Sequence, residues 1–274
     1  MSAAEDHGLA GRVAIVTGGG RGLGRAMTLG LAQAGVRVVA TAARELAEVA
    51  AVAQEAEVTC EEARVRPLLA DVTRAEDCAT VVREAFERFG RLDILVNNAG
   101  RGMKYVSETF LSEPSRFWEV VPETWRMVID TNVNGPFQMA RAVVPAMLDN
   151  GSGRIVNISM NRETMRRCGF SPYGPSKAAL ESETAIWAQD LANTGITVNA
   201  LLPGGATLTG MIPEGLPESA RAGLLAPEII VPPLLWLCSE EATAVTGKRI
   251  DASRWNRDQS SRQPEVDDLE DAGC

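Results

Sequence analysis

Tyr173 and Lys177 stand four residues apart in the segment YGPSK, and these two residue types at this spacing can transfer a proton. A tyrosine hydroxyl has an ordinary pKa of about 10, which is too high for easy proton exchange at neutral pH. A lysine ammonium nearby favours the phenolate and lowers that pKa. On a helix the two side chains lie one turn apart on the same side. We therefore expect Tyr173 to act as an acid/base toward a carbonyl or alcohol oxygen, with Lys177 as its electrostatic partner.

The rest of the composition offers few other catalytic groups. The only histidine is His7, close to the start of the chain, and the chain has two tyrosines. This composition excludes Ser-His-Asp hydrolysis, Cys-His proteolysis and histidine-ligated metals as interpretations. The scarcity of tyrosine makes the Tyr173–Lys177 pair more notable, with a chance i,i+4 pairing on a helix surface as the alternative.

The charge and the apolar pattern argue against a nucleic-acid-binding or membrane protein. The 274 residues are 45% hydrophobic and 23% charged, with a net charge of −9. Nucleic acid and anionic membranes both require basic surface, and no apolar run approaches the roughly 18 residues that span a bilayer. The start, MSAAEDHGLAGR, lacks the apolar region of a signal peptide. We expect a cytoplasmic protein with no nucleic-acid or membrane partner.

The five cysteines are scattered along the chain without paired spacing. An odd number at irregular spacing is typical of reduced thiols in a cytosolic enzyme rather than of a disulfide framework. None of them forms a CxxC motif, so we expect no structural zinc and no metal at the site.

Short apolar runs alternate with amphipathic segments along most of the chain. The runs are residues 12–17, 36–41, 65–70, 92–96, 154–159, 196–202 and 248–251. Continuously apolar strands that alternate with helices require a parallel sheet with both faces covered, and right-handed crossovers make it doubly wound. The sequence therefore predicts a single α/β domain built on a doubly wound sheet of about seven strands. Pro67 places the third strand at an edge, because proline cannot donate to a central ladder.

The two ends of the chain differ in composition from this core. Residues 1–8 are polar, and residues 252–274 are polar and acidic. Segments of this kind cannot bury enough apolar surface to offset the entropy of folding. We therefore expect a flexible N-terminus at 1–8, one folded domain over 9–251 and a disordered tail at 252–274.

The first predicted strand ends abruptly in TGGGRGLG, residues 17–24, and a helical segment follows. Gly18 permits a tight turn, Gly22 lets the backbone approach a phosphate and Gly24 allows close helix–strand packing. The helix N-terminus then directs N–H groups and a positive dipole at an anion. A glycine-rich string by itself is weak evidence, but the strand before it and the helix after it are the context that dinucleotide binding requires. We expect a dinucleotide bound by Gly18, Arg21, Gly22, Leu23 and Gly24.

The second predicted strand indicates which dinucleotide binds. It ends VVATAAR, with no carboxylate before Glu45 to hydrogen-bond a ribose 2′-hydroxyl. Arg21 and Arg44 are instead placed to face a 2′-phosphate, and arginine suits phosphate geometry. NADP(H) is therefore favoured over NAD(H), with a solvated position at a helix start as the alternative role of Arg44.

These motifs, in this order, resemble those of the short-chain dehydrogenase/reductase family over roughly residues 9–251. The matching segments are TGGGRGLG (17–24), ADV (70–72), NNAG (97–100), TNVNG (131–135), YGPSK (173–177) and NALLPGG (199–205). The resemblance implies a Rossmann-type domain and hydride exchange between a nicotinamide and an alcohol or carbonyl.

The resemblance also implies roles for residues in the matching segments. Asp71 and Val72 are expected to border the adenine, Asn98, Ala99 and Gly100 to line the adenosine side, and Pro203 and Gly204 to flank the nicotinamide. Asn132 is expected to support a water-linked proton relay, and Lys177 to reach a cofactor ribose as well as Tyr173. The alternatives are local: Asp71 as a helix N-cap, NNAG as a turn, and Asn132 as a residue that satisfies backbone groups at a helix kink.

One residue of the match is out of register. The family usually has a serine thirteen residues before the tyrosine, which is the position of Met160, whereas Ser159 lies fourteen residues before Tyr173. Adjacent side chains on a strand point to opposite faces, so one residue of register decides which one faces the substrate. We assign the substrate oxygen to Ser159, brought into place by a bulge or an extra loop residue. The alternatives are Asn161 or Thr164 as the donor, or Met160 facing the cleft.

Two loops, 101–122 and 204–227, are expected to shape the substrate site, and the second is punctuated by glycine and proline so that it can close. The apolar residues expected to contribute to a pocket are Phe117, Trp118, Met160, Met165, Phe170 and Met211. Three arginines at 162, 166 and 167 make the neighbouring loop basic, either for an anionic substrate or as solvated charges.

The sequence thus predicts an NADP(H)-dependent alcohol dehydrogenase or ketone reductase for a small to medium, partly apolar carbonyl. Its alternatives are a β-ketoacyl-thioester reductase and, from another class, a cofactor-binding regulator without turnover. The helices predicted near 123–149 and 172–193 are expected to assemble the chain into a homodimer or homotetramer.

Overall fold

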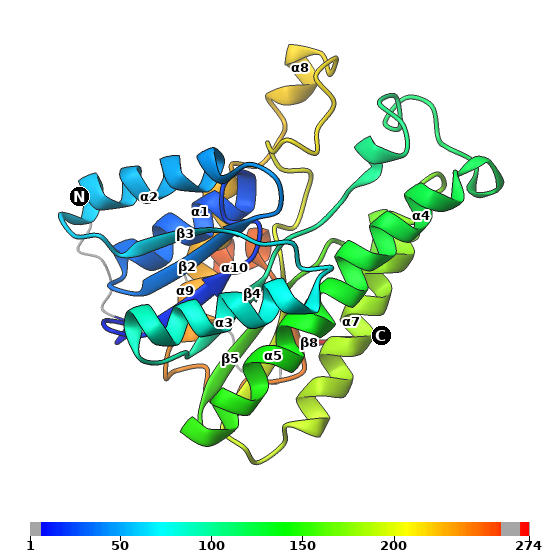
Figure 1. Ribbon diagram of the computed structural model, residues 1–274. Helices are drawn as coiled ribbons and strands as arrows, with labels where there is room; N and C mark the ends of the chain where they lie inside the picture. Colours follow the sequence, from blue (N-terminus) through cyan, green and yellow to red (C-terminus); the bar gives the residue numbers. More distant parts are fainter. Residues whose placement is uncertain (1–6, 259–268, 274) are drawn as a thin grey trace.

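Eight strands form one sheet in the computed structural model, which describes residues 7–258 and 269–273 (Figure 1). Their order across the sheet is β3-β2-β1-β4-β5-β6-β7-β8. The strands are β1 (Val13–Val16), β2 (Arg37–Ala42), β3 (Val65–Leu69), β4 (Ile94–Asn97), β5 (Gly153–Ile158), β6 (Ile196–Leu202), β7 (Lys248–Asp251) and β8 (Glu270–Asp271). Strands β1 to β7 pair in parallel, and β8 pairs antiparallel with β7. The predicted doubly wound α/β fold is confirmed.

Helices cover both faces of the sheet because alternate strand residues supply an apolar surface to each face. In β1, Ala14 and Val16 belong to one buried cluster, and Val13 and Ile15 belong to the other. The first face carries α1 (Gly22–Gln33), α2 (Leu46–Cys60), α9 (Val231–Cys238) and α10 (Ala252–Asp258). The second carries α3 (Ala75–Phe89), α5 (Gly135–Asn150) and α7 (Tyr173–Asp190). This two-sided burial explains why the strands are apolar throughout rather than alternating.

The strand order reverses between β1 and β4, and this switch point indicates where along the sheet a ligand is expected to bind. In a doubly wound sheet, ligands bind beyond the carboxyl ends of the strands at such a switch point. The glycine loop follows β1 and NNAG follows β4, so both lie at that edge. The edge position expected for the strand with Pro67 is confirmed, since β3 ends the sheet and pairs only with β2 among the described residues.

Two expectations about elements need correction. The helix predicted near 123–149 is interrupted: α4 (Pro122–Ile129) passes through a π-helical turn, η3 (Asp130–Asn134), into α5. The tail predicted to be disordered is folded in part, since residues 252–258 form α10 and Glu270–Asp271 forms β8. Trp255 anchors α10 through its contact with Trp236, at 4.4 Å between ring centroids. Residues 1–6, 259–268 and 274 lie outside the described part of the chain, so the predictions for them stay open.

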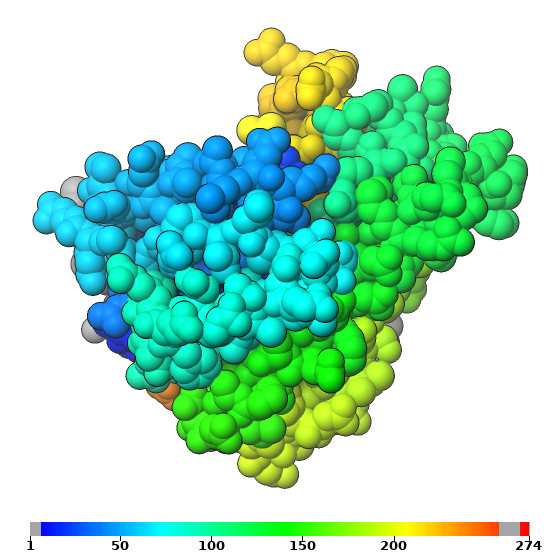
Figure 2. Space-filling view, in the orientation of Figure 1, coloured from blue at the N-terminus to red at the C-terminus, as the bar shows by residue number. Residues whose placement is uncertain are grey.

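The loops at the carboxyl edge rise from one end of the molecule. Figures 1 and 2 show the segment with α8 (Glu218–Arg221, yellow) and the 101–122 loop (green) projecting there. Between β5 and α7 lies the one-turn helix α6 (Arg162–Met165). None of the helices formed by the described residues is both long enough and apolar enough to cross a membrane.

Candidate active site

The glycine loop forms a backbone cradle at the start of α1. Gly18 and Gly22 have positive φ angles of +64° and +52°, which favour glycine. A Cβ on Gly24 would overlap the carbonyl oxygen of Gly18, and a Cβ on Gly18 would lie 3.1 Å from the Cα of Ala99. The N-cap residue Arg21 makes no side-chain bond to the helix in the described structure, so the first N–H groups of α1 stay available to an anion.

The NNAG turn is tied to the same cradle by hydrogen bonds. The Asn98 side chain donates to the carbonyl oxygens of Thr17 at 2.8 Å and Gly18 at 3.0 Å. The Thr17 hydroxyl accepts from the backbone N–H groups of Asn98 and Ala99, both at 3.0 Å. Asn98 therefore braces the glycine loop, while Gly100 lies beside Asn132 and Lys177. Thr17 is the first residue of the TGGGRGLG segment, although no role was expected for it from the sequence.

The residues expected around the adenine lie at the carboxyl end of β3. Asp71 accepts from the Thr73 N–H at 2.9 Å and from its hydroxyl at 2.8 Å, as a turn residue does. Val72 is buried and packs against Gly135 at the start of α5. Asp71 is thus a turn residue and not the helix N-cap given as its alternative, since Arg74 is the N-cap of α3. Its relation to an adenine stays a prediction.

Three arginines surround Tyr105 near the end of β2. Arg44 donates to the Tyr105 hydroxyl at 2.7 Å, and the guanidinium carbons of Arg101 and Arg44 lie 4.9 Å and 5.8 Å from its ring centroid. Burial by itself would raise the pKa of Tyr105, but the bond from Arg44 and the charges of Arg44, Arg101 and Arg21 lower it overall. Arg21 also lies 3.5 Å from Glu48. The cluster is a cationic site suited to a phosphate, and Tyr105 and Arg101 carried no signal of it in the sequence.

Tyr173 and Lys177 occupy the first two turns of α7, as the spacing predicted. The Lys177 ammonium is buried, donates to the carbonyl oxygen of Ile158 at 2.6 Å, and lies 6.0 Å from the Tyr173 ring centroid. Burial lowers the pKa of Lys177 to about 8, and the charge of Glu181 opposes that shift. Burial raises the pKa of Tyr173 to about 12, so the expected lowering by Lys177 is not found in the chain by itself. At neutral pH the hydroxyl is therefore protonated beside a charged lysine.

Asn132 lies in the π-helical turn, where its side chain is fully engaged with its neighbours. Its Oδ1 accepts from the Arg101 N–H at 2.8 Å, and its Nδ2 donates to the Arg101 carbonyl at 3.0 Å and to Ser176 at 2.9 Å. Ser176 in turn donates to the Tyr173 carbonyl at 2.7 Å. Asn132 thus links the segment after β4 to the start of α7. Insertions of this π type are frequent at functional sites.

The structure does not bring the Ser159 hydroxyl to Tyr173. Ser159 is buried and donates to Glu181 Oε1 at 2.6 Å. Met160 instead lies in a buried apolar cluster against which Tyr173 packs. The bulge that would have turned Ser159 toward the site is not formed, because the strand register continues regularly through Ile158 and Ser159 onto β6.

That cluster is called the apolar wall, and its members are Met103, Phe110, Met160, Met165 and Phe170. Met160, Met165 and Phe170 were expected here, whereas Phe117 and Trp118 are 69% and 67% exposed and pack on each other. Asn161, an alternative donor, caps α6 by accepting from the Thr164 N–H at 3.2 Å. The residues beside Tyr173 are thus mainly apolar.

The loop after β6 returns to the glycine loop. Gly204 has a φ of +91°, and a Cβ there would overlap Asp251 and Ser253. Further along the loop, Thr209 lies so near Gly22 that a Cβ on Gly22 would come within 3.0 Å of it. Met211 lies beside Gly102. The 204–227 segment therefore touches both the glycine loop and the segment after NNAG, as a closing loop would.

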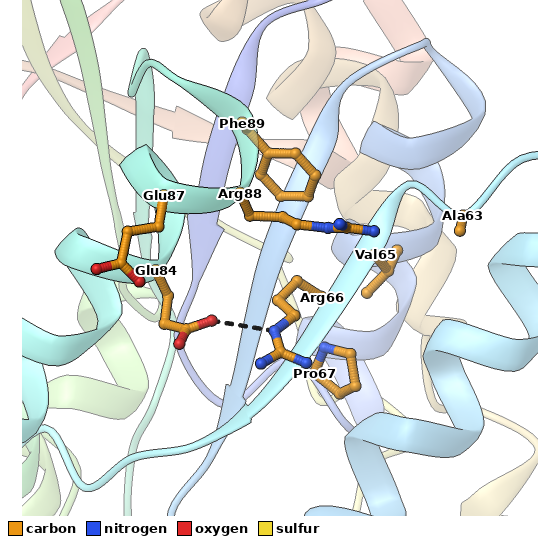
Figure 3. Close-up of a pocket in the computed structure, with 8 residues that line it drawn as sticks. All are labelled: Ala63, Val65, Arg66, Pro67, Glu84, Glu87, Arg88 and Phe89. Atoms are coloured by element: carbon orange, nitrogen blue, oxygen red, sulfur yellow. Dashed lines mark hydrogen bonds and ion pairs between the residues drawn. The ribbon is translucent and has the colours of Figure 1, made fainter.

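A separate hollow of about 540 Å³ lies at the opposite edge of the sheet (Figure 3). It is lined by the first half of β3 and the end of α3, with an ion pair between Arg66 and Glu84 at 3.1 Å. None of the predicted site residues lines it. Because parallel strands present their functional groups at their carboxyl ends, we place the chemistry at Tyr173 and not in this hollow.

Comparison with known proteins decides the family. The family model described as short chain dehydrogenase matches residues 12–218. The chain belongs to the short-chain dehydrogenase family. It is 33% identical to the 3-oxoacyl-(acyl-carrier-protein) reductase FabG of Thermotoga maritima, over 88% of this chain and 96% of that protein. It is 34% identical to an acetoacetyl-CoA reductase of Shinella zoogloeoides, over 88% and 97% of the two chains.

Solved structures of the same family share the fold. The 3-ketoacyl-(acyl-carrier-protein) reductase of Brucella melitensis, solved in complex with NADH, superimposes with a TM-score of 0.77 at 30% identity and covers 89% of this chain. That comparison covers 97% of the Brucella chain. This member of the short-chain dehydrogenase family is accordingly a nicotinamide-cofactor-binding oxidoreductase.

Proposed function

We propose that the protein reduces a ketone carbonyl, with Tyr173 as the proton donor and Lys177 as its electrostatic partner. The observation that carries this proposal is their geometry on α7, with the buried Lys177 ammonium 6.0 Å from the Tyr173 ring centroid. The reverse reaction, oxidation of an alcohol, uses the same residues with the proton moving the other way.

The backbone cradle fits a nicotinamide dinucleotide. Gly18 and Gly22 adopt positive φ angles in the turn before α1, and Gly24 packs directly against the Gly18 carbonyl, so the turn brings backbone to the helix N-terminus, which accepts a pyrophosphate in this fold. Residues at the carboxyl ends of β3, β4 and β6 would hold the rest of the cofactor, namely Asp71, Val72, Asn98, Ala99, Gly100, Pro203 and Gly204. When bound, the cofactor supplies the hydride, which adds to the carbonyl carbon.

Tyr173, assisted by Lys177, supplies the proton for the reduction. Tyr173 is protonated at neutral pH because burial raises its pKa to about 12, so it is ready to donate to the developing alkoxide. The phenolate left behind is stabilised by the Lys177 ammonium. Lys177 has a pKa of about 8, and its charge is therefore lost as the pH rises through that value. We expect the rate of reduction to fall above about pH 8 for this reason.

The substrate we propose is a 3-oxoacyl thioester. The names of two relatives, 3-oxoacyl-(acyl-carrier-protein) reductase and acetoacetyl-CoA reductase, support this class over a general alcohol dehydrogenase. The apolar wall beside Tyr173 suits an acyl chain, because it is built of methionine and phenylalanine side chains.

NADP(H) is the proposed cofactor. Arg44 lies at the end of β2, where a 2′-phosphate is recognised in dinucleotide-binding folds, and Tyr105 holds its guanidinium at 2.7 Å. Arg21 and Arg101 add positive charge around the same tyrosine. A phosphate ester would pair with these guanidinium groups, whereas a ribose hydroxyl has no charge to offer them.

A homodimer or homotetramer in the cytoplasm completes the proposal. Large apolar side chains are exposed on α4, α5 and α7: Trp125, Phe137, Leu148 and Ile186. Such side chains favour burial in a symmetric interface. The four described cysteines are free thiols, as in a reducing compartment.

The test is NADPH oxidation followed spectrophotometrically over acetoacetyl-CoA, longer 3-oxoacyl thioesters and simple ketones. Wild type should turn over the thioesters, and Tyr173→Phe should lose about 10²- to 10⁴-fold in kcat while still binding NADPH. Turnover that survives in Tyr173→Phe contradicts the assigned chemistry.

A second candidate is a cofactor-binding protein without turnover. The observation that favours it is the pairing of Met160 with Tyr173, because a thioether cannot donate a hydrogen bond to a substrate oxygen. Tight NADPH binding with no turnover on any carbonyl in the panel would support this candidate and exclude the reductase.

A further inference from the structure

A buried ion pair lies behind the proposed catalytic pair. Glu181, one helical turn after Lys177 on α7, accepts from Arg249 Nε at 2.9 Å and from the Ser159 hydroxyl at 2.6 Å. The side chains of Arg249 and Glu181 are 5% and 3% exposed. A buried pair of this kind is retained only where its geometry is well satisfied, because removing charges from water is costly.

The pair and Lys177 together hold the end of β5. Arg249 donates through Nη2 to the carbonyl oxygen of Met160 at 2.7 Å, and Lys177 donates to the carbonyl oxygen of Ile158 at 2.6 Å. The residue between them, Ser159, is bound by its hydroxyl to Glu181. Three consecutive residues are therefore fixed, in the orientation that directs Ser159 to Glu181 and Met160 to Tyr173.

The same pair connects this strand end to the C-terminal part of the chain. Arg249 also lies 3.3 Å from Glu270 of β8, through Nη1. Glu270 pairs in addition with Arg254 at 2.9 Å and with Arg162 of α6 at 3.4 Å. β8 and α6 are thus tied to the buried pair, which explains why part of a polar tail is folded.

Charge gives Glu181 a second effect. The groups that face Lys177 are Tyr173 and Glu181 on α7 itself, Asn132 beside Gly100, and the carbonyl oxygen of Ile158 on β5. Arg249 on β7 lies beyond Glu181 and compensates its charge. The acidic side chain therefore acts on Lys177 from the side away from Tyr173.

We propose that Glu181 is a positioning residue for carbonyl reduction. As the anion at the centre of the Ser159–Glu181–Arg249 network, it sets the end of β5 against Tyr173 and keeps Lys177 charged over the working pH range. This inference rests on the proposed function for its kinetic readout, and it assigns a role to a residue that does not touch the substrate.

The test compares Glu181→Gln with Glu181→Asp in two measurements, the pH profile of kcat/KM and the pH dependence of NADPH binding. Glu181→Gln removes the negative charge, so the pKa of Lys177 falls further and the basic limb of both profiles should move down by about one pH unit. Glu181→Asp keeps the charge and should restore the limb to the wild-type position, although it disturbs the packing at least as much. Glu163→Gln, the same substitution at an exposed position, serves as the control whose limb should not move.

Unchanged limbs in Glu181→Gln, or equal shifts in the Gln and Asp variants, would overturn the proposal and leave Glu181 as a folding residue only. If Glu181→Gln does not fold, the double variant Glu181→Gln/Arg249→Gln leaves no unpaired buried charge, and its limb should also move to lower pH. A wild type that binds NADPH but reduces no carbonyl contradicts the proposed function. In that case the pH dependence of NADPH binding still decides the role of Glu181.

Discussion

Two regions of the molecule meet at Tyr173. The first is the glycine loop together with the start of α7, and the second is the apolar wall. The first follows the sequence pattern of the family more closely than the second. In the first region, hydrogen bonds tie the glycine cradle to Asn98, Asn132 to Arg101 and Lys177 to the end of β5, and Tyr173 lies one helical turn before Lys177. The second places Met160 where a serine usually stands and surrounds it with methionine and phenylalanine. In the proposed function the first region carries cofactor binding and proton transfer, whereas the second selects the substrate.

Such a division is expected when one fold serves many substrates. Groups that handle the common chemistry must keep their geometry, because small displacements of reacting groups cost large factors in rate. Groups that contact only the variable part of the substrate are free to change. Met160 in place of the usual serine is unusual, because this residue lies beside Tyr173, where the two regions meet.

Lys177→Met should produce the largest effect, because it removes the bond to Ile158 and the ammonium that we propose stabilises the Tyr173 phenolate. We expect kcat to fall by about 10²- to 10³-fold on every substrate alike. Steady-state kinetics on two thioesters of different chain length measures this. A fall in kcat for only one of the two thioesters would show that Lys177 also affects substrate selection, and would contradict the assignment of separate roles to the two regions.

Arg44→Ala should produce a smaller and selective effect, because it removes a guanidinium from the proposed 2′-phosphate site. The preference for NADPH over NADH should fall about tenfold, or about 1.4 kcal/mol, as measured by fluorescence titration of both cofactors. Tyr105→Phe keeps the ring but loses the bond to Arg44, so its effect should be in the same direction and smaller. Equal losses for NADH and NADPH would show that Arg44 does not read the phosphate; Arg116→Ala is the exposed control.

Glu183→Gln should have the smallest effect, on stability alone. Glu183 on α7 is partly buried, its Oε2 has no hydrogen-bond partner within the described structure, and burial raises its pKa from 4.5 to about 7. The folded protein therefore binds more protons than the unfolded chain between these pH values, and the free energy of unfolding falls as pH rises through them. In thermal melts, the melting temperature of the variant should depend less on pH over that range and should exceed that of wild type at pH 8. Parallel profiles for the two proteins would refute this.

Local patterns made much of the fold and of the first region predictable. The glycine loop, the YGPSK spacing and the edge position of Pro67 each depend on residues close in sequence, and strand periodicity fixed the element order. The second region depends on distant contacts. The Ser159 hydroxyl donates to Glu181, which lies 22 residues later in the chain. Glu181 in turn accepts from Arg249, another 68 residues further along.

Two other features were outside the reach of pattern reasoning for the same reason. Tyr105 meets Arg44 across 61 residues, and although Arg44 was expected at this position, no local motif marks Tyr105 as its partner. β8 is a two-residue strand in an acidic segment, held by Glu270 and Asp271 against arginine and lysine side chains. Composition alone predicted disorder there, because charge pairing to a folded neighbour is not visible in a window of sequence.

The most direct test replaces Ser159 and Met160, the two neighbouring residues at the end of β5, one at a time. Turnover of a 3-oxoacyl thioester is measured for wild type, Ser159→Ala, Met160→Ser and the control Met165→Ser, which alters another methionine of the apolar wall. We expect the turnover rate of Met160→Ser to rise about tenfold or more, since the new hydroxyl is a donor beside Tyr173. We expect the turnover rate of Ser159→Ala to stay within about fivefold of wild type. Ser159→Ala should also unfold at a lower temperature, because it loses one buried hydrogen bond. A loss of about a hundredfold in Ser159→Ala, with no gain in Met160→Ser, would contradict these expectations and return the substrate oxygen to Ser159.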